Sequence, residues 1–376
     1  MNLKKIFTLV MSAIFLISAS AVSAEKISTW QPERKIGILI GVSQVTLQMS
    51  APCVMIDAET KKQIRKIDAN RKFLLNAAKL KSNSVEIRGE KVQLKDLQVT
   101  INDKKYFGGV QINKNSNSIT VINLAPVEEY LRGVVPEEMS PSFEIEALKA
   151  QAIAARSFVL KNSDQHKSQG FDLCATTHCQ VYKGVEVVKS QTDLAIQKTR
   201  GEVIQFGGKT VTTNFHTDSG GMTATCLEVW GTDTPYLQSV EEIQKQTEAW
   251  TKKFSKTDVA SRFGENFGDL KKIELSNLVI GKSASDRTVS GRIKFANFVG
   301  KKTVKLTGNE IRAKFSLPST LCDIKISGDE VIFSGFGRGH GVGMSQQGAN
   351  NFAKAGWTYD KILKHYYKGT EIKKLY

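Results

Sequence analysis

The sequence predicts an α+β fold, in which a β-rich N-terminal lobe precedes a mixed α/β core with a glycine-lined cleft. Three observations support this class. Apolar and β-branched stretches recur between residues 35 and 123, small apolar residues follow a helical spacing after residue 140, and glycine runs lie near residues 219 and 339. A chain of 376 residues is long enough for two or three domains.

The first lobe is predicted from its strand patterns. Residues 36–45 are rich in apolar and β-branched residues, and residues 85–87 form a shorter stretch of the same kind. Residues 106–112 alternate and contain glycines, and residues 118–122 follow after a polar turn. These patterns predict a β-rich N-terminal domain over residues 25–125.

The character of the chain changes at Pro126. Ser140 and Pro141 predict a helix start, with serine as N-cap and proline at the first helical position. Apolar residues at helical spacing then predict a buried helix, which places Glu138 on the turn directly before it. The core is assigned to residues 126–376, with a mixed lateral segment at about 241–325 and a final helix near residues 359–367.

The N-terminus predicts export. Lys4 and Lys5 precede an apolar run over residues 6–17, and small residues end at Ala24. This is the pattern of a secretory signal peptide, assigned to residues 1–24. The alternative is an uncleaved anchor, which would hold the protein at the outer face of the membrane. Both alternatives predict a secreted or extracytoplasmic, wall-associated protein.

The net charge of +16 predicts anionic partners. Nucleic acid is a poor candidate for an exported protein, whereas wall polymers and the carboxylates of peptidoglycan are abundant outside a bacterial membrane. The alternative is that the lysines only keep the protein soluble.

Three segments carry the chemistry. The first contains Glu137 and Glu138 and continues into the helix, the second contains a Ser-Gly-Gly turn, and the third is a glycine-rich run near the C-terminus. They occupy residues 130–157, 215–231 and 339–346. In this order they resemble the stage II sporulation protein D family, which includes the amidase-enhancer proteins. The resemblance covers the chain from about residue 106 to its end.

The resemblance implies a lytic transglycosylase that cuts peptidoglycan glycan strands. Glu138 matches the family's catalytic acid, and Glu137 is the adjacent competitor. A lytic enzyme needs one carboxyl group that first donates and then accepts a proton, whereas ordinary glycoside hydrolysis usually needs two. Such an acid must be protonated near neutral pH, and Val134, Val135 and Met139 are apolar neighbours suited to raise its pKa.

Other polar residues of the three segments are candidate glycan contacts. Arg156 suits a muramyl lactyl carboxylate, although it is equally compatible with an exposed helix position. The remaining predicted sugar contacts are His216, Ser219, Gly220, Gly221, His340, Ser345 and Gln346. The alternative for the glycines is that they only satisfy a positive φ.

A separate cluster predicts a metal site. Cys174, His178 and Cys179 are close in sequence, and His166 lies upstream. Two thiolates with one or two imidazoles suit tetrahedral zinc, and some members of the resembled family carry zinc in this region. The alternative is a Cys174–Cys179 disulfide, which is plausible in an exported protein. Because the predicted reaction needs no hydroxide, the expected zinc is structural.

The predicted function is therefore cleavage of glycan strands to 1,6-anhydromuramyl ends, in sporulation or wall remodelling. We expect strands already stripped of their peptide stems to be preferred, and a cell-wall amidase to be a partner. The alternative within the family is a non-catalytic enhancer that binds the wall and stimulates an amidase. A general polyanion-binding module is supported by charge alone.

Overall fold

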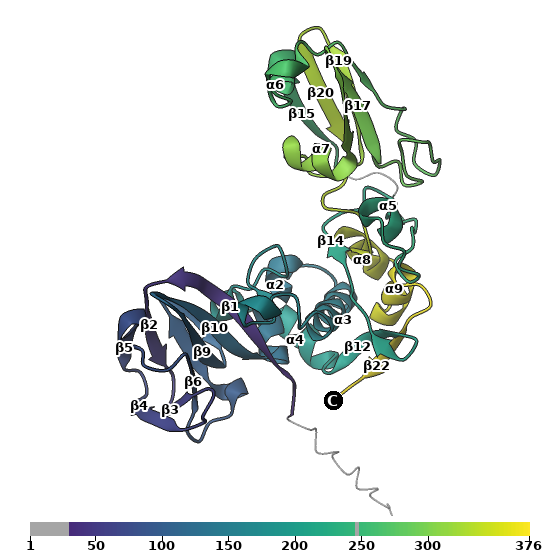
Figure 1. Cartoon of the computed structure of the whole chain (residues 1–376). Coiled ribbons are helices and arrows are strands. Elements are labelled where there is room, and N and C mark those ends of the chain that lie inside the picture. Colours follow the sequence, from purple (N-terminus) through teal and green to yellow (C-terminus); the bar gives the residue numbers. More distant parts are fainter. Residues whose placement is uncertain (1–29, 245–247) are drawn as a thin grey trace, which may run out of the picture. The chain divides into compact units, whose positions relative to one another are not determined.

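The computed structural model describes residues 30–244 and 248–376 (Figure 1). It confirms the predicted α+β class, with a β-rich N-terminal region. All elements belong to the compact unit Gln31–Tyr376. The predicted signal peptide, residues 1–24, lies outside the described residues. Within the described ranges, every helix is too short or too polar to cross a bilayer.

Two sheets form the N-terminal region. One has seven strands in the order β11-β1-β10-β9-β6-β3-β4, and the other has four in the order β5-β2-β7-β8. Their bounds are β1 Glu33–Val42, β2 Gln44–Met49, β3 Cys53–Asp57, β4 Gln63–Ile67, β5 Lys72–Asn76, β6 Ser84–Gly89, β7 Gln98–Ile101, β8 Lys104–Phe107, β9 Gly109–Asn115, β10 Ser118–Pro126 and β11 Leu173–Cys174. Short 3-10 turns, Ala77–Lys79 and Leu94–Asp96, connect some of them.

The stretch predicted as one strand over residues 106–112 is two strands. Gly108 has a φ of +92° and separates β8 from β9, which belong to different sheets. A Cβ at this position would lie 2.0 Å from the carbonyl oxygen of Leu124. Glycine therefore permits both the backbone conformation and the close approach of β10.

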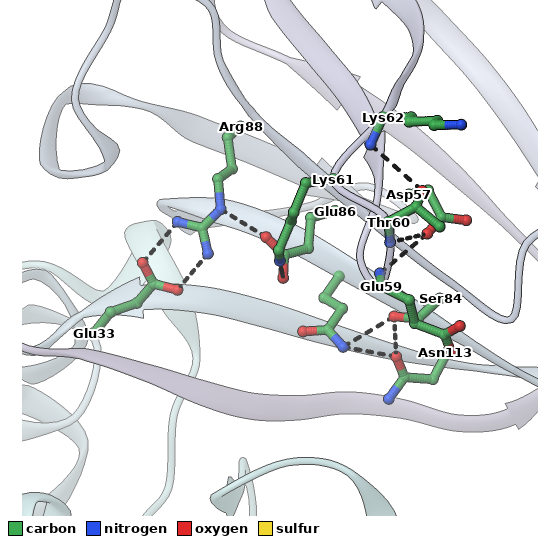
Figure 2. Close-up of polar contacts among 11 residues, drawn as sticks. Glu33, Asp57, Glu59, Thr60, Lys61, Lys62, Ser84, Glu86, Arg88 and Asn113 are labelled. Carbon is green, nitrogen blue, oxygen red and sulfur yellow. Dashed lines mark hydrogen bonds and ion pairs between the residues drawn. The ribbon is translucent and has the colours of Figure 1, made fainter.

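A chain of alternating charges joins non-adjacent strands of the seven-stranded sheet (Figure 2). The Arg88 guanidinium contacts both carboxylate oxygens of Glu33, at 2.8 and 2.9 Å, and Glu86 at 2.9 Å. Nζ of Lys61 lies 3.6 Å from Oε1, the other carboxylate oxygen of Glu86. Since β9 and β10 lie between β1 and β6, the Arg88–Glu33 pair links strands that share no backbone hydrogen bonds.

The long helix of the core is α3, Ile145–Lys161, which is buried along most of its length. The prediction that it starts at Ser140 is wrong. The amide of Phe143 donates to the carbonyl of Ser140 at 3.0 Å, so Ser140 opens a separate turn. The helix begins after Glu144, whose amide donates to the side chain of Asn350 at 2.9 Å.

The α3 helix packs against two hydrophobic clusters. One contains Ala155 and Val159 together with strand residues such as Ile36 and Val121. The other contains the opposite face of α3 and the C-terminal helices. The elements around α3 are α1 Val127–Arg132, α2 Val135–Glu138, α4 Ser190–Lys198, β12 Glu202–Phe206, β13 Lys209–Thr210, β14 Phe215–His216, α5 Cys226–Trp230, β21 Met344–Ser345, α8 Gln346–Lys354, α9 Tyr359–Tyr366 and β22 Glu371–Lys374, with 3-10 turns at Lys167–Gln169 and Gly184–Val187.

A lateral module has its own aromatic-rich cluster, with Phe298, Phe315 and Phe333 at its centre. It contains two three-stranded sheets, β15-β20-β19 and β16-β17-β18. Its elements are β15 Trp250–Ser255, α6 Lys256–Ser261, β16 Lys272–Glu274, β17 Phe295–Val299, β18 Thr303–Thr307, α7 Gly308–Lys314, β19 Cys322–Ser327 and β20 Glu330–Gly335, with a 3-10 turn at Glu265–Phe267. The term lateral module refers below to residues 248–335.

Candidate functional site

A cleft of about 480 Å³ lies where α2, α3, β14 and α5 meet. Among the described residues that form its lining, most are polar and uncharged, and Glu138 is the single carboxylate. The lining residues are Glu138, Phe158, Asn162, Gln165, Thr177, His178, Cys179, Val181, Thr212, Thr213, Asn214, Phe215, His216, Thr217, Trp230, Gly339, His340 and Gln346. Side chains from all three sequence segments are thus brought together.

Glu138 is the last residue of α2, and its carboxyl group is held in one orientation. One oxygen, Oε1, accepts a hydrogen bond from the amide of Val181 at 3.0 Å. Burial raises the pKa of this carboxyl above its usual 4.5, and the Val181 amide opposes the shift without cancelling it. Because Oε1 is engaged as an acceptor, the proton of the neutral acid belongs on Oε2.

Glu137, the competing residue, has a different environment. Its carboxylate forms an ion pair with Lys183, and it is absent from the residues that line the cleft. Of the two adjacent carboxyl groups, only that of Glu138 lines the cleft among the described residues.

Two of the three histidines that line the cleft, His216 and His340, are held in different ways. His216 is 5% exposed, and its Nδ1 lies 3.2 Å from the carbonyl oxygen of Val342, to which it must donate. Burial lowers the pKa of His216 well below 6.5, with His340 and Arg292 adding to the effect. The ring is therefore neutral, and its Nε2 is an acceptor with no hydrogen-bond partner among the described residues.

His340 is held by the backbone at both ring nitrogens. Its Nε2 donates to the carbonyl of Phe215 at 3.0 Å, and its Nδ1 accepts from the amide of Val342 at 3.1 Å. Burial lowers its pKa to about 4, so this ring is also neutral. His340 can offer a ring face to a ligand, whereas Nε2 of His216 is buried.

Arg156 does not reach the cleft, and its interpretation as a glycan contact is corrected by its burial. The side chain is 0% exposed. Its guanidinium binds both carboxylate oxygens of Glu128, at 2.9 and 2.8 Å, and the carbonyl of Glu202 at 3.1 Å. A group with no accessible surface cannot bind a polymer, so Arg156 ties α1, α3 and β12 together.

The Ser-Gly-Gly turn is also buried. The carbonyl of Ser219 accepts from Nη2 of Arg292 at 2.6 Å, and a Cβ at Gly220 would lie 2.4 Å from Leu321 of the lateral module. The predicted glycan contacts at Ser219, Gly220 and Gly221 are therefore corrected, because these residues are buried and line no part of the cleft. The turn instead packs against the lateral module.

The third segment contains both a fully buried residue and residues that line the cleft. Ser345 is 0% exposed and caps α8, where its hydroxyl accepts from the amide of Gly348 at 3.0 Å. It is a capping residue rather than the predicted sugar contact. Gln346, the next residue, does line the cleft.

The predicted metal ligands converge. The ligand atoms of His166, Cys174, His178 and Cys179 all lie within 4.8 Å of one another. Sγ of Cys179 is 3.3 Å from Nε2 of His166 and 3.5 Å from Nδ1 of His178, and Sγ of Cys174 is 3.8 Å from the same Nδ1. Tetrahedral zinc with bonds of 2.0–2.3 Å separates its ligands by roughly 3.3–3.8 Å. The donor set therefore fits zinc.

The surroundings of the cluster agree with this fit. Both cysteines are free thiols. Burial alone would raise the pKa of Cys174, but hydrogen bonds from Thr176 outweigh it and bring the pKa to about 6. Cys174 also lies on β11, which pairs in parallel with β1. Four protein ligands would leave no open position, as in structural rather than catalytic zinc sites.

Comparison with known proteins identifies the family. Residues 115–206 match the family described as stage II sporulation protein. Stage II sporulation protein D of Bacillus subtilis is 36% identical over 268 residues, which cover 66% of this chain and 74% of the relative. The chain belongs to the stage II sporulation protein D family.

Other relatives extend the match. An uncharacterized protein of Brachyspira hyodysenteriae is 33% identical over 313 residues, covering 79% of this chain and 80% of the relative. A Bacillus subtilis protein named amidase enhancer is 29% identical over 352 residues, covering 79% of this chain and 49% of that protein. Residues 237–343, which include the lateral module, match a domain of unknown function.

Several residues that line the cleft were not predicted from the sequence. Val181 binds Glu138 through its backbone amide, and a backbone contact leaves no side-chain pattern in the sequence. Asn162 and Gln165 follow α3, and residues 212–215 precede His216. Trp230 could have been found, because a tryptophan beside a glycine within a shared motif is an unusual candidate for a core position.

Proposed function

We propose that this protein is a lytic transglycosylase that cleaves peptidoglycan glycan strands, with Glu138 as its acid and base. The observation that carries the proposal is that Glu138 is the single carboxylate among the described residues that line the cleft, and that burial raises its pKa. Hydrolysis by two carboxylates requires a second such group within about 5–10 Å of the first. A reaction served by one group fits the lining better.

The proposed reaction uses that group twice. Protonated Oε2 of Glu138 donates its proton to the glycosidic oxygen, and the bond from that oxygen to muramyl C1 breaks to give an oxocarbenium-like sugar. The C6 hydroxyl of the same sugar then attacks C1, and the Glu138 carboxylate accepts its proton. The products are a free hydroxyl on the leaving sugar and a 1,6-anhydromuramyl end. The acid is regenerated and no water is consumed.

Other cleft residues bind and orient the strand. The amide of Gln346 suits a hydroxyl or an N-acetyl group, whereas the acceptor nitrogen of His216 is buried in the wall of the cleft. Zinc held by His166, Cys174, His178 and Cys179 would supply a cross-link in the loop that leads to Val181. That loop positions the amide that orients Glu138.

The substrate is further proposed to be glycan from which the peptide stems have been removed. The cleft walls carry hydroxyls and amides, and free lactyl carboxylates would be attracted by the net charge of +16. Cleavage of intact sacculi should therefore be slower than cleavage of amidase-treated strands at equal sugar concentration. The proposed setting is extracytoplasmic, in sporulation or wall remodelling.

The test of the activity is Glu138→Gln, with Glu137→Gln as the matched control. Glu138→Gln should abolish the release of anhydromuramyl products while binding to stem-free strands survives, because shape is kept and only the proton is lost. Glu137→Gln should retain activity. A fully active Glu138→Gln variant would refute the proposal.

A second candidate is a non-catalytic enhancer that binds the wall and stimulates an amidase. It is favoured by the relative named amidase enhancer. The two functions differ in product: an enhancer leaves the glycan intact and accelerates stem release by an added amidase. Mass analysis of the glycan after incubation with the wild-type protein separates them.

A further inference from the structure

Trp230 is a large apolar side chain that the fold leaves in contact with solvent. It is the last residue of α5, its side chain is 43% exposed, and it lines the cleft. Its ring lies 4.9 Å from the ring of His340, tilted by 50°. Burying a tryptophan side chain normally stabilises a protein substantially. An exposed tryptophan in the wall of a cleft is therefore a candidate contact for a ligand.

The position of Trp230 is fixed from both ends of its short helix. Thr225 and Glu228 form a capping box at the start of α5, and Gly231 ends it with a φ of +77°. These contacts satisfy the backbone of a helix too short to be stable by itself. The indole is therefore presented on a defined backbone.

The lateral module adds two further contacts to the same helix. The side chain of Asn309, on α7, donates to the carbonyl of Val229 at 2.8 Å. The amide of Val289 donates to the Glu228 carboxylate at 3.3 Å. Both donors lie within the stretch that matches a domain of unknown function. The module thus contacts the two residues that directly precede Trp230.

The chemistry of the cleft narrows the choice of ligand. An exposed aromatic face beside hydroxyls, amides and two further aromatic residues, Phe158 and Phe215, matches a molecule with both a polar rim and an apolar face. A pyranose ring has these properties, since its hydroxyls point outward and its axial C–H groups form an apolar face that packs on aromatic rings. An apolar protein partner would instead be expected to meet a continuous apolar surface.

We propose that Trp230 is an aromatic subsite for one sugar ring of the bound strand, and that the lateral module positions it through Asn309 and Val289. The inference rests on the proposed glycan substrate, but not on cleavage. It gives the stretch of unknown function a role, which is to support the short helix that carries Trp230.

The binding experiment uses the full chain carrying Glu138→Gln, so that the strand is not consumed. The probe is a stem-free glycan tetrasaccharide, and the readout is its dissociation constant by calorimetry. Trp230→Ala should raise the dissociation constant on the order of 10-fold, as expected for an aromatic anchor, and Trp230→Phe by less. Leu227→Ala is the matched control, because Leu227 is 55% exposed on the same helix and does not line the cleft.

Tryptophan fluorescence reports the same contact independently. Binding of the tetrasaccharide should change the emission of the Glu138→Gln protein, and Trp230→Phe should remove most of that change. Equal affinities for the Trp230→Ala and Leu227→Ala proteins would overturn the subsite. So would an emission change that survives in Trp230→Phe.

The positioning role has its own readout. Asn309→Ala, in the full chain that also carries Glu138→Gln, should raise the dissociation constant for the stem-free tetrasaccharide a few-fold. In a Trp230→Ala background it should add little, because the group it positions is gone. Equal effects in both backgrounds would refute positioning.

Failure of the inference and failure of the proposed activity can be told apart. If Glu138→Gln abolishes cleavage but Trp230→Ala binds normally, the activity stands and the subsite is wrong. If the wild-type protein leaves the glycan intact but binding depends on Trp230, the subsite stands and the activity is wrong.

Discussion

Replacing Arg156 by methionine tests whether this residue serves the fold or the ligand. The change keeps an unbranched side chain on α3 but removes the charge that faces Glu128. In the structure the pair is buried and doubly hydrogen-bonded. We expect a large loss in the free energy of unfolding and, in the protein that remains folded, unchanged affinity for stem-free glycan.

The size of the expected loss in stability follows from the hydrogen bonds that Glu128 keeps in the variant. Removing one partner of a buried ion pair typically costs 3–5 kcal/mol. Glu128 would still accept from the hydroxyl of Tyr376 at 2.7 Å and from the amide of Gly201 at 3.4 Å, which places the expected loss near the lower limit, about 3 kcal/mol. Arg156→Lys should cost less than Arg156→Met, because an ammonium group keeps the positive charge. It should still cost some stability, because an ammonium group cannot form both hydrogen bonds to Glu128.

Urea unfolding followed by circular dichroism gives the free energies. Combining Glu128→Gln with Arg156→Met should restore part of the loss, because no buried charge is then left unpaired. If Arg156→Met unfolds like the wild type but loses glycan affinity, Arg156 contacts the ligand and the reasoning is wrong.

The same pair predicts a pH dependence. Burial alone would raise the pKa of Glu128, but Arg156 outweighs it and the pKa is lowered. A carboxyl group with a lowered folded pKa stabilises the protein above its unfolded pKa, near 4.3, and this contribution is lost as the pH falls through the folded value. Glu128→Gln should therefore lose less stability on acidification than the wild type.

Three further predictions concern the metal, the acid and a glycine. The purified protein should carry about one equivalent of zinc by elemental analysis, and Cys174→Ser should lose it together with thermal stability, whereas Cys226→Ser should not; a metal-free protein with a Cys174–Cys179 bridge by mass mapping would contradict this. The kcat/KM for glycan should fall with rising pH through one group whose pKa lies above the usual glutamate value, because burial raises the pKa of Glu138; a decline centred at or below pH 4.5 would argue against it. Gly341→Ala should destabilise the protein by roughly 2 kcal/mol or more in thermal unfolding, since its Cβ would lie 2.3 Å from the Arg292 side chain, whereas Gly207→Ala, which meets open space, should cost less; equal losses would show that only φ matters.

Local patterns in the sequence predicted the α+β class and the buried helix, but not where elements end. The strand predicted over residues 106–112 ignored the turn at Gly108, because alternation continues across it while the chain changes sheets. The Ser140-Pro141 pair resembles a helix start, yet it opens a turn, and the helix begins where the side chain of Asn350 receives the amide of Glu144. Contacts between residues 206 positions apart leave no local signal.

The site was predictable where residue type limits chemistry. Glu138 is buried in the structure, and the four predicted zinc ligands lie close together. Few other roles suit residues of these types in these positions. Arg156 and Ser219 were misread because a motif shows that residues matter, not whether they face a ligand or the interior. Trp230 is the opposite case. Only its exposure in the structure shows that it faces the cleft and not the interior.

The parallel pairing of β1 with β11 has a consequence for dividing this protein into fragments. Gly37 is in register with Cys174 at the edge of the seven-stranded sheet, so one of the proposed zinc ligands is held by a strand that lies 137 positions earlier in the chain. A truncation that starts where the family match begins, at residue 115, would discard that strand and free the loop that carries Val181. Exchanging N-terminal lobes between relatives therefore requires preserving this register. The smallest fragment that keeps the cleft intact must therefore include β1, although none of its residues lines the cleft.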